Sequence, residues 1–149
     1  MTLLTTVLAF LLTLGVLVVI HEYGHYWVAR KCGVKVLRFS IGFGRPLARW
    51  VRGTDRTEWV VAAIPLGGYV RMLDERDPEC QPIAGADLPR AFNRQPVSRR
   101  IAIVLAGPVA NLLLAVAVYW FLSVVGVFEP AAVVGTPAPA TPAARAGLL

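Results

Sequence analysis

The sequence predicts a mainly α-helical membrane protein, in which two transmembrane helices flank a membrane-associated β-hairpin or small sheet. Three observations lead to this prediction. Of the 149 residues, 56% are hydrophobic, which is more than soluble domains of this length usually carry. Two long stretches of the chain are almost free of charge. The basic residues gather between these stretches, where short patterns of alternating apolar and polar residues also occur.

The first predicted span covers residues 1–29, in which Glu22 is the only charged side chain. At about 1.5 Å per residue, the uncharged run from Thr2 to Ile20 crosses a hydrocarbon core of about 30 Å. A signal peptide is the alternative for any apolar amino terminus, but the run has no basic residues before it and no small-residue cleavage site after it. We therefore expect a retained transmembrane helix that ends near Gly33.

The second predicted span covers residues 101–128 and contains no charged side chain as far as Phe128. Every Lys and Arg except Arg145 lies in the segment 30–100 between the spans. By the positive-inside rule this segment is cytoplasmic, and both ends of the chain lie outside the cytoplasm. A net charge of +6 can also indicate nucleic-acid binding. Because the spans already explain where the charges lie, we expect a lipid bilayer as partner and no nucleic acid.

Residues 30–100 contain the signals for the predicted hairpin or small sheet. Apolar and polar residues alternate from Leu37 to Phe43, which predicts a strand with one apolar face. A second strand is predicted over residues 59–64, broken by Pro65 and resumed around residues 67–72. The acidic, Pro-rich stretch from residue 74 to residue 89 predicts a loop. Because Cys32 and Cys80 lie in this cytoplasmic segment, we expect no disulfide.

His21, Glu22 and His25 form a His-Glu-x-x-His motif at the end of the first span, and no other histidine occurs in the chain. Two histidines four residues apart lie on one helix face, where both can bind one Zn²⁺ ion. Glu22 then serves as the catalytic base that takes a proton from water. The motif also arises by chance in soluble helices. Ionisable side chains at the end of a membrane span are costly, however, which favours a functional role.

A catalytic zinc site normally has three protein ligands, and the sequence offers only His21 and His25 at this place. Neither predicted span contains a further carboxylate. We therefore expect the third ligand to lie outside these 149 residues. The alternative is that the chain is a non-catalytic, truncated membrane module. A reading frame that continues beyond Leu149 would favour the enzyme, and a stop codon there would favour the module.

Four motifs occur in the same order as in a known family: His21–His25, Phe39–Gly44, Ile64–Val70 and Ala106–Asn111. With these motifs the chain resembles the amino-terminal part of bacterial site-2 proteases of the regulator of sigma-E protease type, which are zinc intramembrane metalloproteases. The resemblance covers essentially the whole chain. It implies regulated intramembrane proteolysis, in which a transmembrane substrate such as an anti-sigma factor is cleaved.

The resemblance also implies a location and a longer chain. It implies a multi-pass protein of the bacterial inner membrane, with the loop 30–100 in the cytoplasm and both termini in the periplasm. Residues 129–149 resemble a periplasmic linker followed by the beginning of a PDZ domain, which is truncated at residue 149. In the family, the third zinc ligand is an Asp of a later span, within a Leu-Asp-Gly motif. The chain is therefore expected to be an amino-terminal fragment.

Four residues are expected to bind substrate because of the resemblance. Gly42, Phe43 and Gly44 match a Gly-x-Gly motif in a loop that dips into the membrane and holds the substrate as an added strand. Strand addition suits a protease, since it exposes a peptide bond and satisfies the hydrogen bonds of the substrate. The alternative is that the two glycines only form a turn. Asn111 belongs to the family motif near the active site, where it positions the zinc helix or the substrate, or serves in helix packing.

Overall fold

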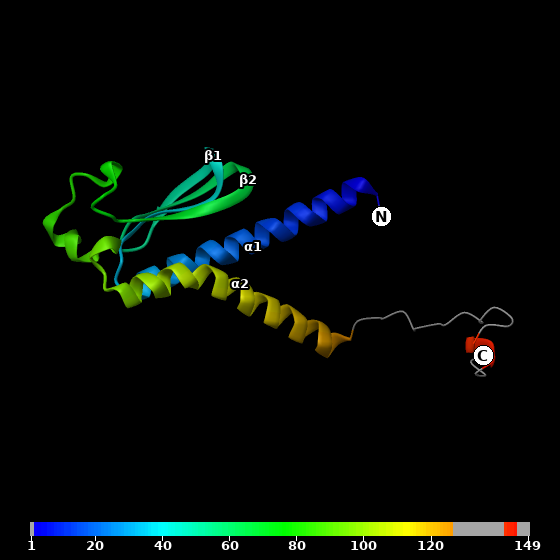
Figure 1. Ribbon diagram of the computed structural model, residues 1–149. Coiled ribbons are helices and arrows are strands. Elements are labelled where there is room, and N and C mark those ends of the chain that lie inside the picture. The colour runs from blue at the N-terminus through cyan, green and yellow to red at the C-terminus, as the bar shows by residue number, and fades with distance from the viewer. Residues whose placement is uncertain (1, 127–141, 146–149) are drawn as a thin grey trace. The chain divides into compact units, whose positions relative to one another are not determined.

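The computed structural model describes residues 2–126 and 142–145. The chain divides into two units, Met1–Val118 and Tyr119–Leu149, and only the first contains the candidate site. Two long apolar helices, α1 (Leu3–Lys31) and α2 (Val97–Val125), flank a small antiparallel sheet in sequence, as predicted (Figure 1). The other elements are β1 (Val36–Arg52), β2 (Thr57–Met72), α3 (Pro142–Arg145) and three short 3-10 helices, Pro78–Cys80, Gly85–Arg90 and Phe92–Arg94.

Helix α1 ends where the sequence predicts. Gly33 adopts the left-handed conformation with φ of +81°, which residues other than glycine rarely adopt. The Gly33 amide donates to the carbonyl of Arg30 (3.1 Å), and the Val34 amide donates to the carbonyl of Ala29 (2.9 Å). This pair of hydrogen bonds is the Schellman motif, which satisfies the last carbonyl groups of a helix. It turns the chain sharply into β1.

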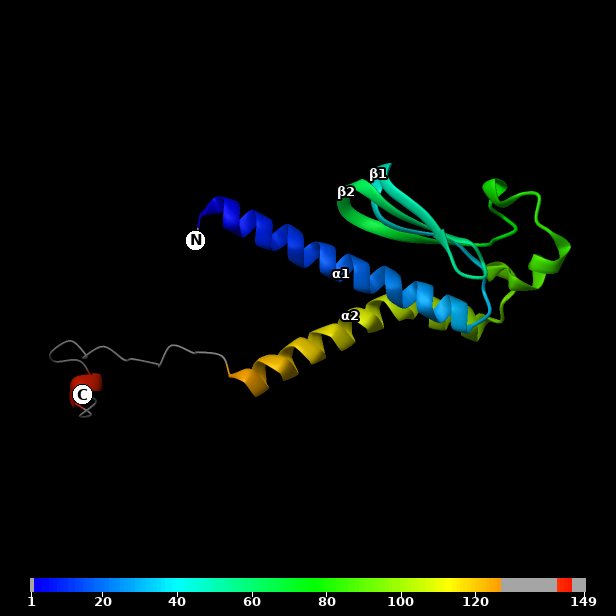
Figure 2. The ribbon, with the colours of Figure 1, turned by 180° about the vertical axis from the view of Figure 1, so that it is seen from behind.

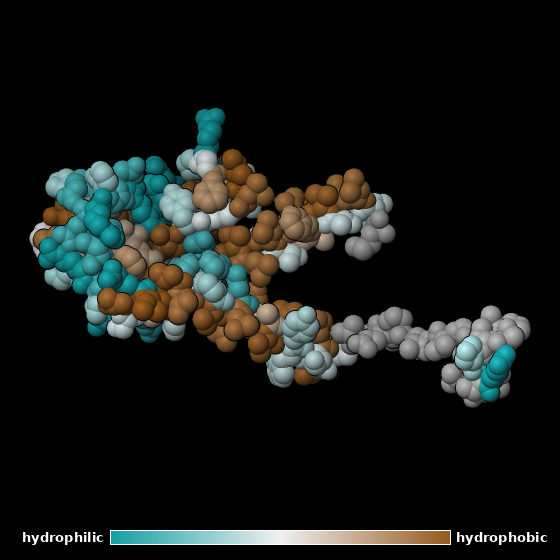
Figure 3. Space-filling view, in the orientation of Figure 1, coloured by the Kyte–Doolittle hydropathy of each residue, from teal (hydrophilic) through white to brown (hydrophobic). Residues whose placement is uncertain are grey.

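Both α1 and α2 are long and apolar enough to cross a membrane. Brown, hydrophobic residues line both helices in Figure 3. Helix α2 begins at Val97, one turn before the predicted start at Ile101. The early start has a physical reason, because the Arg99 guanidinium donates to the Gln95 side chain (3.0 Å) and to the Cys32 carbonyl (3.3 Å). A charged first turn is therefore compatible with the helix, although the sequence pattern placed it outside the span.

The sheet has two strands. Both strands bend, so that residues 38–41 of β1 pair with two different parts of β2. Phe39 of β1 pairs with both Trp59 and Val70 of β2, and the neighbours of Phe39 also have partners on two sides. Residues 46–52 of β1 pair with residues 57–62. Residues 68–72, in contrast, have strand partners on one side only among the described residues. This segment is called the edge segment below.

Strand β1 is longer than predicted, since residues 46–52 continue it to Arg52. Alternation could not reveal this part, because these residues are mostly exposed and rich in arginine. Gly42 and Gly44, with φ of +89° and +84°, allow the bend between the two halves. Strand β2 continues through Pro65. The predicted break there corresponds to a stretch between Ile64 and Gly68 that has no strand partner among the described residues, so the missing N–H of proline disrupts no strand pairing.

An aromatic cluster fixes the sheet on α1. The ring of Tyr26 lies edge-on to Phe39 and Trp59, with centroids 5.7 and 5.1 Å away. Phe39 is 2% exposed. Ile103 of α2 belongs to the same buried cluster. Figures 1 and 2 show β1 and β2 alongside α1 from opposite sides. The sheet is therefore held against the half of α1 that carries the histidines.

Residues 74–95, called the polar segment below, contain the three 3-10 helices. The sequence predicted only a loop over residues 74–89, where the first of these helices and most of the second lie. Ion pairs tie the segment to the sheet and to the end of α1. Arg90 donates to Asp55 (2.7 Å), and Lys35 donates to Asp87 (2.6 Å). The Phe92 amide donates to the Leu73 carbonyl at the end of β2 (2.7 Å). Hydrophilic residues gather over this segment in Figure 3.

In the second unit, the structure describes the last turns of α2 and the single turn α3. The predicted periplasmic linker and the beginning of the predicted PDZ domain, residues 129–149, lie largely outside the described residues. Both stay predictions.

Candidate metal centre

His21 and His25 lie one turn apart on α1, with ring centroids separated by 4.9 Å. Their Nε2 atoms both lie close against Gly107 of α2. A Cβ atom on Gly107 would lie 2.6 Å from Nε2 of His21 and would also collide with Nε2 of His25. The two nitrogens can therefore approach α2 this closely only because residue 107 has no side chain.

The Nδ1 atoms of the two rings face α2. The Nδ1 of His25 donates to the carbonyl oxygen of Ile103 (2.7 Å), since that oxygen can only accept. This hydrogen bond leaves the Nε2 lone pair of His25 free for a metal, which is the usual arrangement around metal-binding histidines. The Nδ1 of His21 lies 3.3 Å from the side-chain amide of Asn111.

A close helix crossing brings α2 to the histidines. A Cβ atom on Gly24 would lie 2.5 Å from the carbonyl oxygen of Ala106 and 2.8 Å from the Cβ of Ala110. Small residues at such a crossing let two helix backbones approach each other. The crossing thereby places Ile103, Gly107 and Asn111 within reach of the imidazole rings.

The donor set suits zinc, for which imidazole nitrogen is a common ligand in tetrahedral sites. The Nε2 atoms of His21 and His25 lie beside the same glycine, and that of His25 has its lone pair free, so the pair could supply two ligands to one ion. Within residues 2–126 and 142–145, no third His, Cys, Asp or Glu joins the two histidines. The described residues thus fit part of a zinc site, with two ligands and an adjacent carboxylate.

Glu22 lines, together with His25, a cavity of about 490 Å³ that we call the Glu22 groove. Its walls come from Glu22 and His25 of α1, the edge segment of β2, Ile103 and Val104 of α2, and Asp74 and Phe92 of the polar segment. Gly68 lies directly against Glu22. A Cβ atom on Gly68 would lie 2.9 Å from Cγ of Glu22, so the strand backbone can approach the carboxylate only because this residue is glycine.

The structure does not bring Gly42 and Gly44 into the Glu22 groove. Both line a separate cavity of about 90 Å³. Phe43 lines that same cavity, and its ring stacks on Tyr69 of the edge segment with centroids 6.3 Å apart. Their expected role in substrate binding stays a prediction.

Sequence reasoning did not single out the edge segment or Ile103 as parts of a site. A signal for the edge segment was present in the pair Gly67-Gly68, since glycine inside a strand pattern often marks close approach of another group. No sequence signal could identify Ile103, because it acts through its backbone carbonyl.

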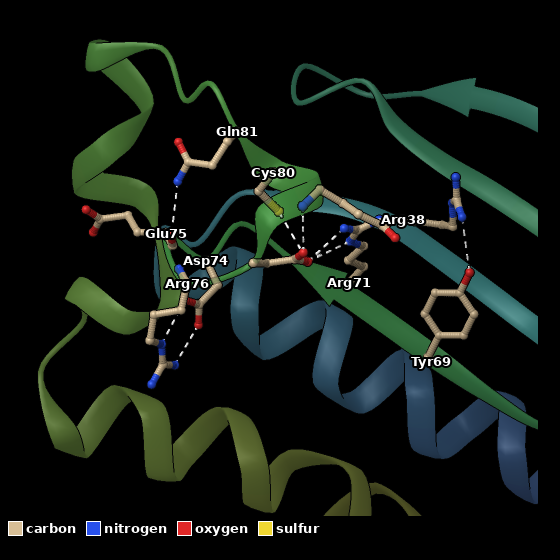
Figure 4. Close-up of polar contacts among 10 residues, drawn as sticks. Arg38, Tyr69, Arg71, Asp74, Glu75, Arg76, Cys80 and Gln81 are labelled. Carbon is tan, nitrogen blue, oxygen red and sulfur yellow. Dashed lines mark hydrogen bonds and ion pairs between the residues drawn. The ribbon is translucent and has the colours of Figure 1, made fainter.

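Ion pairs fix the end of the edge segment, as Figure 4 shows. Arg71 lines the Glu22 groove and donates from Nε and Nη2 to one carboxylate oxygen of Asp77 (3.1 and 2.7 Å). The hydrogen bond from Arg71 holds the pKa of Asp77 below its usual range. The Arg76 side chain lowers the pKa of Asp74 in the same way, and that of Arg94 lowers the pKa of Glu75. These carboxylates are therefore charged at neutral pH.

Comparison with known proteins gives one family and several close relatives. The family model described as "Peptidase family M50" matches residues 9–143. A Ralstonia nicotianae protein named "Putative zinc metalloprotease" is 60% identical over 147 residues, which cover 96% of this chain and 32% of the relative. The Salmonella typhimurium "Regulator of sigma-E protease RseP" is 52% identical over 140 residues, which cover 93% of this chain and 30% of the relative. The chain thus spans about a third of the length of these relatives.

Proposed function

Because the chain belongs to peptidase family M50, we propose that the intact protein is a zinc-dependent intramembrane endopeptidase of the site-2 type. The observation that carries this proposal is that the His21 and His25 Nε2 atoms lie together beside Gly107, while Glu22 lines one groove with His25. The relatives named as zinc metalloprotease and regulator of sigma-E protease support the same activity.

His21 and His25 hold the ion in this proposal, and Glu22 acts as general base and then as general acid. Bound zinc polarises the scissile carbonyl and lowers the pKa of a water molecule toward about 7. Glu22 takes the proton of the attacking water on its carboxylate and passes it to the leaving nitrogen of the cleaved peptide bond. The third ligand is an Asp of a later span, within a Leu-Asp-Gly motif outside these 149 residues.

The substrate binds as a strand added to the edge segment, residues 68–72. This segment has strand partners on one side only and lines the Glu22 groove. A helical substrate hides its peptide bonds, whereas an added strand exposes one and satisfies its own backbone groups within the membrane. Strand addition beside Gly68 would place the scissile bond near Glu22 and His25.

The proposal includes a place in the cell. The site lies toward the cytoplasmic end of the first span in a multi-pass protein of the bacterial inner membrane, and residues 30–100 are cytoplasmic. His21 lies about 27 Å along α1 from Leu3 at about 1.5 Å per residue, which is close to the far side of a hydrocarbon core. A periplasmic PDZ domain follows α2. The substrate class is a transmembrane protein such as an anti-sigma factor, cleaved by regulated intramembrane proteolysis.

The test is the variant Glu22→Gln in the full-length protein. We expect it to keep its zinc but to lose cleavage of a transmembrane reporter substrate, because the amide cannot take a proton. Asp87→Asn is the control, since it also removes one carboxylate but lies outside the groove. Cleavage by Glu22→Gln at the rate of the parent would refute the assignment.

The presence of only two ligands among the described residues favours the second candidate, a non-catalytic membrane module. Zinc content of the full-length protein separates the two. One tightly bound ion that is lost in His21→Ala supports the protease, whereas no zinc in the parent supports the module.

A further inference from the structure

Asn111 of α2 contacts His21, and only one of the two polar atoms of its side-chain amide has a hydrogen-bond partner among the described residues. Its Nδ2 atom lies 3.3 Å from Nδ1 of His21. Its Oδ1 atom is buried and has no hydrogen-bond partner among the described residues. A buried carbonyl oxygen without a partner costs stability, so its presence calls for an explanation.

The protonation of His21 decides which end of the amide can face it. A neutral imidazole carries one proton, and a metal binds the nitrogen that lacks it. If the Asn111 NH₂ group donates to Nδ1, the proton of His21 lies on Nε2, and that nitrogen cannot bind an ion. For Nε2 to be a ligand, Nδ1 must carry the proton and needs an acceptor. Oδ1 is the acceptor that Asn111 can offer.

The amide can supply that acceptor by turning over in place, because its oxygen and NH₂ ends have nearly the same size and shape. The turn leaves the side chain where it is and places Oδ1 beside Nδ1 of His21. The NH₂ group then occupies the position that Oδ1 has now.

His25, on the same two helices, already shows this arrangement of an Nδ1–H that donates to an oxygen of α2. Its Nδ1 donates to a carbonyl oxygen of Ile103, which cannot turn over because it belongs to the backbone of α2. Both rings are thus backed by α2, one by a backbone carbonyl and the other by a side-chain amide. Gly107 lies between the two contacts in the sequence, and the Nε2 atoms of both rings lie close against it.

We propose that Asn111 is a positioning residue for His21, whose Nδ1–H it accepts through Oδ1, so that Nε2 is free to bind zinc. This inference rests on the proposed zinc site. It gives Asn111 a role in ligand alignment in place of contact with substrate. Asn111 is not among the residues that line the Glu22 groove, which agrees with a role other than substrate contact.

The test is zinc affinity, measured on the full-length protein in detergent by competition with a chelating dye. Asn111→Leu keeps a side chain of similar size without an acceptor, and we expect zinc to bind about 10–100-fold more weakly. Asn111→Asp keeps an oxygen acceptor at the same place, and we expect an affinity near that of the parent. The control is Ser123→Ala on the same helix. The Ser123 hydroxyl donates to the Tyr119 carbonyl within α2, so its removal should leave the zinc affinity unchanged.

The melting temperature of the zinc-free protein separates positioning from packing. We expect Asn111→Leu to leave this temperature unchanged while its zinc affinity falls. Unchanged zinc affinity in Asn111→Leu, with a raised KM for substrate, would overturn the inference in favour of substrate contact. Equal weakening in Asn111→Leu and Asn111→Asp would also overturn it, since the acceptor would then not be the property that matters. If the parent itself bound no zinc, the proposed function would fail and the inference with it.

Discussion

The two halves of α1 differ in composition and in surroundings. Residues 3–17 contain no charged residue and no histidine, and their side chains are mostly exposed, as with Leu4 and Phe10, which are 67% and 64% exposed. Residues 18–31 contain both histidines and three charged residues, and Tyr26 and Ala29 are 8% and 0% exposed, because the sheet and α2 pack against this half. The half that carries the polar groups is therefore the half that the rest of the protein covers.

The difference shows how a membrane helix can hold ionisable groups. An exposed position on a spanning helix faces lipid, where a charged or hydrogen-bonding side chain is costly. In the second half of α1, the edge segment and α2 surround Glu22 and His25. The protein supplies hydrogen bonds there, as the contact between His25 and the Ile103 carbonyl shows. Matched substitutions inside and outside the covered half of α1 test this explanation.

The largest expected effect is the removal of Phe39 from the aromatic cluster on the second half of α1. Phe39→Ala should lower the free energy of unfolding by about 3–5 kcal/mol, because it leaves a cavity between Tyr26 and Trp59. Phe10→Ala in the first half should have little effect on the same measurement, since Phe10 packs against no buried cluster. Thermal unfolding in detergent measures both. Equal losses in the two variants would contradict the contrast between the halves.

A smaller effect is expected at the helix crossing. Gly24→Ala places a methyl group against the Ala106 carbonyl, and we expect a loss of about 1–3 kcal/mol together with weaker zinc binding. Gly15→Ala is the matched control in the first half, because nothing lies within 4 Å of its Cβ position. It should be neutral or slightly stabilising, since alanine favours a helix over glycine. A Gly24→Ala variant as stable as Gly15→Ala would show that the crossing is looser than the structure indicates.

Acid should loosen the polar segment without affecting the first half of α1. Arg76 and Arg71 lower the pKa of Asp74 and Asp77 below the ordinary value of 3.8, and Arg94 lowers the pKa of Glu75 below 4.5. The charged carboxylates stabilise the segment above these ordinary values, and this stabilisation is lost as the pH falls below them. Amide hydrogen exchange measures it at Glu75 and Phe92, whose amides are hydrogen-bonded. Protection that is unchanged between pH 6 and about pH 3 would contradict this prediction.

The smallest effect is expected from a single ion pair beside the end of α1. Lys35→Met removes the closer of two ion-pair partners of Asp87 and leaves Arg90 at 3.8 Å, and the side chains of Lys35 and Asp87 are about a quarter exposed. Partly exposed pairs contribute about 0–1 kcal/mol, and salt screens them. The loss should therefore shrink further in high salt, as chemical denaturation at two salt concentrations can measure. A loss of more than about 2 kcal/mol would contradict the small contribution expected of this ion pair.

Several features of the fold followed from local patterns. The end of α1 was predictable because Gly33 accepts a left-handed conformation that other residues avoid. The first half of β1 was predictable as a strand from the alternation of apolar and polar residues. The single apolar face was not confirmed, because Ser40 is 1% exposed and Phe43 is 44% exposed. The second half of β1 was not, since residues 46–52 are mostly exposed and owe their strand conformation to pairing with residues 57–62.

By itself, the sequence determined two apolar helices, the basic segment between them and the His-Glu-x-x-His motif, because each depends on residue type and spacing along one element. Only the tertiary structure decided what surrounds the motif. It brings Gly68 against Glu22, Ile103 against His25 and Asn111 against His21 across 46, 78 and 90 residues of sequence, respectively. Such contacts depend on how closely separate backbones approach, and no local pattern encodes that distance.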